Sequence, residues 1–206
     1  KIYIKNILTN VYKYHMKILA IQNRMGIGDT VIFLPFIKAL YKKFNSPISL
    51  LVKESSKADQ YLFQTNYIDK ILILERDSHN NSRHSGFLGS LNLIKDLKKH
   101  NFDKIFIFNS SLRFNLIAKF SNIPEIFQYP LFSKNKQHIV NTPKKFLKDK
   151  LNIDIFEDPD IQVDNILVTN AAKKFLINNE KTNILLGIGG SGSTKRIPAN
   201  IFLKFM

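Results

Sequence analysis

The sequence contains no cysteine, and only 8 glycines and 7 prolines among its 206 residues. The absence of cysteine excludes disulfide scaffolds, zinc–thiolate sites, iron–sulfur clusters and thiol nucleophiles. The low glycine and proline content excludes collagen-like and low-complexity chains. No apolar run approaches the roughly 20 residues that a membrane-spanning helix requires. Hydrophobic residues nevertheless make up 44% of the chain, including 17 phenylalanines, which is enough to bury a core.

Acidic residues are also scarce, with 16 Asp and Glu against 31 Lys and Arg, and the formal net charge is +15. Such a charge suits an anionic partner: nucleic acid, a membrane surface or a phosphorylated substrate. It also suits a surface of solvated lysines. Lysines are spread along the whole chain, whereas proteins that read nucleic acid usually cluster arginine. This distribution favours the solvated surface, and we expect no nucleic-acid partner.

Strand-like and helix-like segments alternate through most of the chain. Continuous apolar runs predict strands at 17–22, 48–53, 70–75 and 103–109, with a short strand within 123–130. Between and after them, helical spacing predicts helices at 30–44, 55–64, 89–100, 112–120 and 142–151. This alternation predicts an α/β fold, a Rossmann-like parallel sheet with helices on both faces.

The pattern divides the chain into four parts. Residues 1–15 are basic and partly apolar, lack the features of a signal peptide, and form an N-terminal extension. Residues 16–165 form the first Rossmann-like domain, and 166–182 a linker with a helix at 168–178. Residues 183–206 open a second domain with a fresh strand at 183–187. We expect this second domain to be truncated, because the last residues form an apolar helical pattern without a stop signal.

The first candidate site lies in the loop that follows the first strand, residues 24–30. Gly26 and Gly28 allow the backbone to approach a ligand closely. Asp29 falls at the start of a helix, where a carboxylate can simply act as an N-cap. A dinucleotide fingerprint beginning at Gly26 would need a third glycine where this chain has Val31. A carboxylate at the carboxyl end of a parallel strand also suits a general base.

The second candidate site is the glycine-rich turn at 187–196, between the expected strand and a helix that begins near Pro198. Backbone N–H groups and a basic side chain in such a turn can hold a phosphate. The turn is not a P-loop, because Thr194 precedes Lys195 instead of following it. The alternative is a mobile surface turn.

Three segments, taken in order, resemble the family-nine glycosyltransferases, the heptosyltransferase-like enzymes. The first is KILAIQNRMGIGDTVIFLPFIKALYKKF, which holds Ile27-Gly28-Asp29 and Pro35 through Leu40. The second is FDKIFIFNSSLRFNLIAKF, with Arg113 at the family's basic position. The third is GIGGSGSTKRIPANIFLKFM, in which Ile197 stands where the family usually has an aromatic residue. His138 loosely matches a family histidine, but we interpret it as a plain surface histidine.

The resemblance implies the GT-B fold, with two Rossmann-like domains facing a cleft, of which this chain holds the N-terminal half. It implies that Asp29 deprotonates the acceptor hydroxyl for an inverting displacement, and that Gly26, Gly28 and Arg113 contact the acceptor. The second-domain turn would hold the diphosphate of the donor through Gly189, Gly190, Ser191 and Lys195. No metal and no cofactor besides the nucleotide-sugar substrate is implied.

The implied partners are a nucleotide-sugar donor and an anionic or lipid-linked saccharide of the cell envelope as acceptor. The location would be the cytoplasm, with room for peripheral contact at the inner face of the plasma membrane. We expect the 206 residues alone not to catalyse transfer, because most of the donor half lies beyond them. Two alternatives stay open: a nucleotide- or NAD-binding Rossmann oxidoreductase, and a basic nucleic-acid-binding domain.

Overall fold

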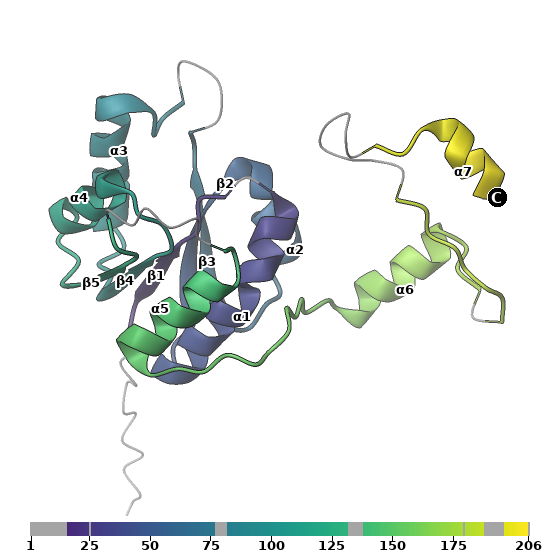
Figure 1. The fold of residues 1–206 in the computed structure, drawn as a ribbon, viewed down its shortest axis with the longest axis horizontal. Coiled ribbons are helices and arrows are strands. Elements are labelled where there is room, and N and C mark those ends of the chain that lie inside the picture. Colours follow the sequence, from purple (N-terminus) through teal and green to yellow (C-terminus); the bar gives the residue numbers. More distant parts are fainter. Residues whose placement is uncertain are drawn as a thin grey trace, which may run out of the picture. The chain divides into compact units, whose positions relative to one another are not determined.

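The computed structural model describes residues 16–24, 26–76, 82–131, 138–178, 180–187 and 196–205. The chain divides into two compact units, Lys1–Val163 and Asp164–Met206. The first unit is a doubly wound α/β domain (Figure 1), and the expected parallel sheet with helices on both faces is confirmed.

The sheet of the first unit has five strands, all parallel, in the order β3-β2-β1-β4-β5. The strands are β1 (Ile18–Ile21), β2 (Ile48–Lys53), β3 (Ile68–Leu74), β4 (Lys104–Ile107) and β5 (Glu125–Gln128). Every residue of the central strands β1 and β4 is buried. Such burial is what continuous apolar runs predict when helices cover both faces.

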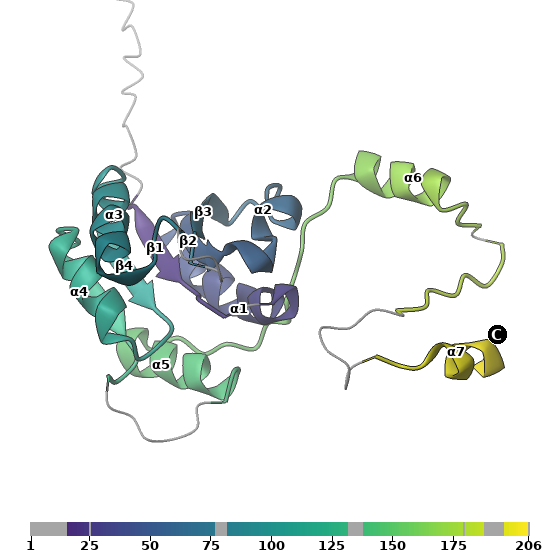
Figure 2. The ribbon, with the colours of Figure 1, turned by 90° about the horizontal axis from the view of Figure 1, so that it is seen from above.

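Two groups of helices cover the sheet (Figure 2). On one face, the core includes buried residues of α1 (Ile27–Phe44), of α5 (Asn141–Leu151) and of the short α2 (Ala58–Tyr61), which follows the 3-10 helix η1 (Glu54–Ser56). On the other face it includes residues of α3 (Gly86–Lys98) and α4 (Leu112–Phe120). Successive side chains of β1 point to opposite faces of the sheet, so β1 contributes to both cores. Ile18 and Ala20 belong to the first core, and Leu19 and Ile21 to the second.

Two helices begin three residues earlier than the sequence predicts. Helix α1 starts at Ile27 because Gly26, in an extended conformation, is its N-cap. Asp29, expected at the cap, therefore lies in the first turn. Helix α3 starts at Gly86, whose φ of 64° lies in the left-handed region that glycine tolerates.

The second unit contains α6 (Asn165–Lys174) and α7 (Ala199–Phe205). The strand expected at 183–187 is wrong: residues 182–187 form neither helix nor strand, and Leu185 is 98% exposed. A strand needs a hydrogen-bonded neighbour, and the described residues of this unit supply none. An apolar run alone does not create such a neighbour.

Candidate active site

The sheet has one point where the direction of its winding reverses. From β1 the chain moves outward to β2 and β3, and then returns to place β4 on the opposite side of β1. The loops that leave β1 and β4 therefore diverge at the carboxyl edge of the sheet. In open α/β sheets, ligands bind in the crevice that forms at this switch point.

Asp29 lies in the first turn of α1, at the carboxyl edge of the sheet beside the switch point. Its Oδ2 atom accepts a hydrogen bond of 3.2 Å from the backbone N–H of Gly26. The backbone N–H and the hydroxyl of Thr30 both donate to the Gly26 carbonyl, each at 3.2 Å. The positive end of the helix dipole stabilises the ionised carboxylate. Asp29 is half-buried, so its carboxylate is fixed in position and remains accessible.

The two glycines of this loop have different roles. A β-carbon on residue 26 would lie 3.4 Å from the Oδ2 atom of Asp29, in close van der Waals contact with the carboxylate. A β-carbon on residue 28 would meet nothing within 4 Å. Gly28 consequently leaves open space next to Asp29 in the sequence.

A polar group of side chains closes the carboxyl end of β1, β4 and β5. The Nδ2 atom of Asn109 donates to Oδ1 of Asn23 at 3.3 Å, joining the loops after β4 and β1. The amide of Gln128 donates to the carbonyls of Asn109 at 3.1 Å and Ser111 at 2.9 Å. Together with the two buried side chains described next, these residues form the switch-point cluster: Gln22, Asn23, Asn109, Gln128 and Tyr129.

Two donor atoms of the switch-point cluster are buried without a hydrogen-bond partner, although the Oε1 atom of Gln22 accepts from the backbone N–H of Arg24 at 3.1 Å. They are the Nε2 atom of Gln22, a residue 2% exposed, and the hydroxyl of Tyr129, a residue 4% exposed. The strand register continues into a row in which Gln22, Phe108 and Tyr129 occupy the same face. Burial raises the pKa of Tyr129, and the charge of Arg24 acts in the opposite direction. The Tyr129 hydroxyl therefore lies within electrostatic reach of Arg24.

Sequence reasoning did not single out Gln22 or Tyr129, because neither belongs to a recognisable motif. Only the pairing of β1, β4 and β5 brings them into one row. A buried donor without a partner costs about 1–3 kcal/mol. Two such donors at the switch point are groups that a ligand with oxygen acceptors could satisfy.

Arg113 lies in the first turn of α4, where it joins α4 to α3. Its Nε atom donates to the Ser90 hydroxyl at 2.8 Å, and its guanidinium also donates to the His84 carbonyl. Burial lowers the pKa of Arg113, and the charge of Arg76 lowers it further. The side chain nevertheless stays cationic, as arginine does throughout the physiological range. Both hydrogen bonds are made to groups of the chain itself, and the contact of Arg113 with the acceptor stays a prediction.

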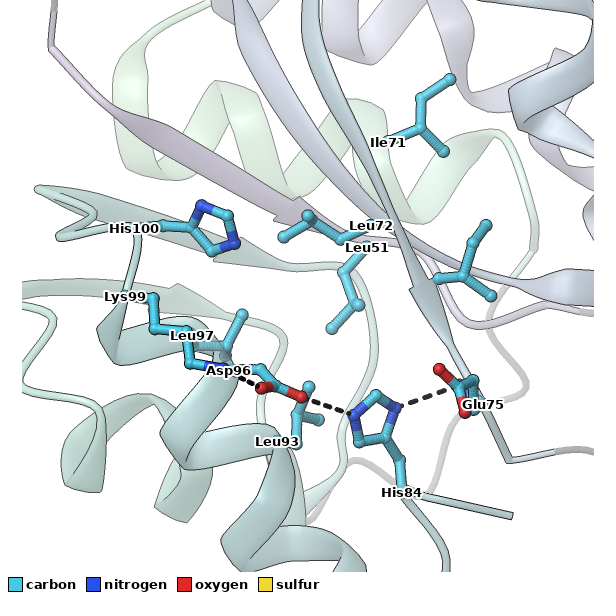
Figure 3. A pocket seen from close by; sticks show the side chains of 11 residues that line it. Leu51, Ile71, Leu72, Glu75, His84, Leu93, Asp96, Leu97, Lys99 and His100 are labelled. Atoms are coloured by element: carbon cyan, nitrogen blue, oxygen red, sulfur yellow. Dashed lines mark hydrogen bonds and ion pairs between the residues drawn. The ribbon is translucent and has the colours of Figure 1, made fainter.

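A second polar group lines a cavity of about 310 Å³ between β3 and α3 (Figure 3). The Nδ1 atom of His84 accepts a 3.1 Å hydrogen bond from the backbone N–H of Glu75. Its Nε2 atom must therefore carry the proton, and it lies 3.3 Å from the carboxylate of Asp96. Asp96 also accepts from the guanidinium of Arg83 and the ammonium of Lys99. We call this group the His84 cluster: Glu75, Arg83, His84, Asp96 and Lys99.

The imidazole of His84 and the carboxylate of Asp96 are paired within the His84 cluster. Burial raises the pKa of Asp96, but hydrogen bonds from Arg83, Lys99 and His84 outweigh it and hold the pKa well below its usual value. The five histidines do not cluster in the sequence, and only the fold brings His84 to Asp96. Both ring nitrogens of His84 are engaged, so this cluster fits a structural role.

The remaining expected residues are less informative. Gly189, Gly190, Ser191 and Lys195 lie outside the described residues. The Nδ1 atom of His138 accepts from the backbone N–H groups of Val140 and Asn141, both at 3.3 Å, which caps the start of α5. Within the described ranges, no three His, Asp or Glu side chains converge as metal ligands.

Comparison with known proteins identifies the fold. A scan of protein-family models gives no match, and no curated protein matches the chain. The crystal structure of the glycosyl transferase family 9 from Veillonella parvula DSM 2008 superposes with a TM-score of 0.69 at 17% identity, over 92% of this chain and 58% of that one. The structure of E. coli ADP-heptose lps heptosyltransferase II superposes with a TM-score of 0.54 at 14% identity, over 80% of this chain and 52% of that one.

The chain therefore spans little more than half the length of these two structures. It has the fold of the family 9, heptosyltransferase-like glycosyltransferases, as the resemblance predicts.

Proposed function

We propose that this chain forms the acceptor-binding half of an inverting glycosyltransferase. The enzyme would transfer a sugar from a nucleotide-sugar to an anionic or lipid-linked saccharide of the cell envelope. The observation that carries the proposal is the position of Asp29. Its carboxylate lies in the first turn of α1, at the switch point of a glycosyltransferase fold, hydrogen-bonded to Gly26 and still accessible.

In the proposed reaction, Asp29 accepts the proton of the acceptor hydroxyl while that oxygen attacks the anomeric carbon of the donor. The bond from the anomeric carbon to the diphosphate breaks, and the diphosphate leaves with the electron pair. Attack from the side opposite to the leaving group inverts the anomeric centre. The half-buried carboxylate suits this task, because a base must be fixed in position and yet reach the substrate.

The charge that gathers on the departing diphosphate would be held by Lys195, Ser191 and the backbone N–H groups of Gly189 and Gly190. Backbone donors and a lysine can provide this stabilisation without a metal ion. The name of the E. coli neighbour, which includes ADP-heptose, supports a nucleotide-sugar donor. We place the enzyme in the cytoplasm, in peripheral contact with the inner face of the plasma membrane, where a lipid-linked acceptor would be found.

The substitution Asp29→Asn tests the proposal in a form of the protein that carries both halves of the fold. The side-chain oxygen of asparagine can still accept the hydrogen bond of the Gly26 N–H, so the helix start should be preserved. The rate of sugar transfer should fall by at least about 100-fold, the typical contribution of a general base. The control is Asp59→Asn, which changes an exposed carboxylate in the short helix α2 and should leave the rate unchanged. Near-normal transfer by the Asp29 variant would reduce Asp29 to a helix cap.

Lys195→Ala tests the donor side in the same protein. It should weaken binding of the nucleotide-sugar by more than about 1.5 kcal/mol, the low end for hydrogen bonds to charged groups. Acceptor binding should hardly change. Titration calorimetry with each substrate measures both affinities, and an unchanged donor affinity would remove Lys195 from the site.

A further inference from the structure

Helices α3 and α4 expose large apolar side chains to solvent. Phe87 is 80% exposed and Leu88 74%, although both lie in the first turn of a well-formed helix. Scattered exposed leucines need no explanation, but a contiguous apolar patch usually marks an interaction site. We call this surface the outer face of α3 and α4, and define it by Phe87, Leu88, Leu91, Leu112, Leu116 and Phe120.

The apolar residues lie on the side of each helix that is turned away from the sheet. In α3 the buried positions are Gly89, Leu93 and Leu97, spaced four residues apart on one side of the helix. At 100° per residue, Phe87, Leu88 and Leu91 lie on the opposite side. The side chains of these three residues therefore point away from the core of this unit.

The same holds for α4. Its buried positions are Phe114, Ile117 and Ala118, and its exposed leucines and phenylalanine recur every four residues. The buried residues of α3 and α4 join the same core on the same face of the sheet. The two helices lie next to each other (Figures 1 and 2), so their outward sides form one continuous surface.

The charges beside these apolar residues are almost all positive. Lys95 and Lys98 lie on the outward side of α3, and Lys119 lies beside Leu116 and Phe120 in α4. Helix α4 contains no acidic residue. The single acidic residue of α3, Asp96, is already engaged by Arg83 and Lys99. The outer face therefore combines exposed aromatic and leucine side chains with uncompensated lysines.

We propose that the outer face of α3 and α4 docks on an anionic lipid bilayer. Amphipathic helices with Phe and Leu on one side and lysines beside them bind in the interface plane of such membranes. Each lysine near an anionic surface contributes about 1 kcal/mol. The proposed contact is made by side chains at the surface of the bilayer. No described helix is both long enough and apolar enough to cross it.

Docking in this way has a consequence for the candidate active site. Helices that connect parallel strands run antiparallel to them, so α3 and α4 both begin at the carboxyl edge of the sheet. Phe87, Leu88 and Leu112 therefore lie at the same edge as Asp29. That a membrane-bound acceptor is presented there rests on the proposed function, whereas docking itself can be measured without donor, acceptor or transfer.

Co-sedimentation with lipid vesicles tests the proposal. The protein should bind vesicles that contain phosphatidylglycerol more tightly than vesicles of phosphatidylcholine alone, and added salt should weaken that binding. The double change Phe87→Ser with Leu88→Ser should lower the partition coefficient at least about tenfold, since two large apolar side chains no longer enter the interface. The double change Lys95→Glu with Lys98→Glu should lower it at least about fivefold on anionic vesicles only.

The matched control is Phe156→Ser, which removes a phenylalanine that is 90% exposed but lies outside α3 and α4. The partition coefficient of the Phe156→Ser variant should remain within about twofold of that of the unchanged protein. Circular dichroism should show that all variants fold, because every altered side chain is at the surface. Equal binding by the Phe87/Leu88 variant and the Phe156 variant would overturn the proposal. The proposal would also be overturned if the protein did not bind vesicles but self-associated, and if the Phe87/Leu88 change abolished that self-association. A second copy of the chain would then cover the outer face of α3 and α4.

Discussion

The two polar clusters of the first unit lie on different parts of the same sheet and differ in one respect. In the His84 cluster, both ring nitrogens of the buried histidine are engaged. In the switch-point cluster, the Nε2 atom of Gln22 and the hydroxyl of Tyr129 are buried without a partner. Both clusters are polar and partly buried, but among the described residues only the switch-point cluster has buried donors without a partner.

This difference separates a group that stabilises the fold from one that is prepared for a ligand. A paired buried network contributes to the stability of the domain, and removal of one member leaves the others unsatisfied. Unpaired buried donors reduce stability, and persist where another group can satisfy them. We therefore expect changes in the His84 cluster to alter stability, and changes in the switch-point cluster to alter binding.

The largest effect on stability should come from Gly89→Ala, which breaks the support of the His84 cluster. A β-carbon on residue 89 would lie 2.2 Å from the carbonyl carbon of His84, closer than any real contact. Since the crowded atoms are backbone, α3 or the His84 segment must move. The free energy of unfolding should fall by about 3 kcal/mol, the upper range for overpacking. Urea denaturation measures the loss.

The control for this change is Gly28→Ala, at a position where a β-carbon meets nothing within 4 Å. Alanine is the better helix former, so the free energy of unfolding should stay the same or rise by up to about 1 kcal/mol. If both alanine variants were equally stable, the tight contact between Gly89 and His84 would not exist in solution.

A smaller loss should follow Asp96→Ala, which leaves the Nε2–H group of His84 buried and unpaired. The expected cost is about 2 kcal/mol in thermal or urea unfolding. Asp154→Ala provides the comparison, because it breaks an exposed ion pair with Lys148 and should cost no more than about 0.5 kcal/mol. Equal losses would show that the His84 cluster is only a surface network.

The sequence predicted the sheet well because its strands are continuous apolar runs. It placed β2 at 48–53 and α4 at 112–120, as the structure does. The sequence did not predict the first turns of α1 and α3, because the glycines in those turns are typical of loops. The strand at 183–187 was wrong because a strand depends on a partner that lies elsewhere in the chain.

The candidate site was predictable only where it is local. Gly26, Gly28 and Asp29 are neighbours in the sequence, and they form the start of α1 shortly after strand β1. Tyr129 lies more than one hundred residues from Gln22, and only the register of β1, β4 and β5 places them in one row. Pairings of this kind cannot be inferred from residue types along a single segment.

Two buried tyrosine hydroxyls of the first unit differ in whether they have a hydrogen-bond partner. Tyr67 donates to the carbonyl of Asp160 at 2.8 Å, whereas the hydroxyl of Tyr129 has no partner. Tyr67→Phe should cost about 1 kcal/mol of stability, as for a typical hydrogen bond. Tyr129→Phe should leave stability unchanged or raise it slightly, and should weaken acceptor binding. A Tyr129 variant that loses as much stability as the Tyr67 variant would mean that its hydroxyl is paired in solution.

The smallest effect should be a pH dependence that arises beside the His84 cluster. His100 lines the same cavity. Burial lowers its pKa, the charges of Lys70 and Lys17 lower it further, and Asp69 and Asp96 oppose them. The folded protein therefore binds this proton less readily than the unfolded chain does. The stabilisation from a neutral His100 is complete above the unfolded pKa of about 6.5 and is lost as the pH falls from there through the folded pKa. Urea denaturation of the unchanged protein and of His100→Gln at several pH values measures this effect, because the gap between their unfolding free energies should shrink as the pH falls. A gap that stays constant between neutral and mildly acidic pH would show that His100 titrates as freely as in the unfolded chain.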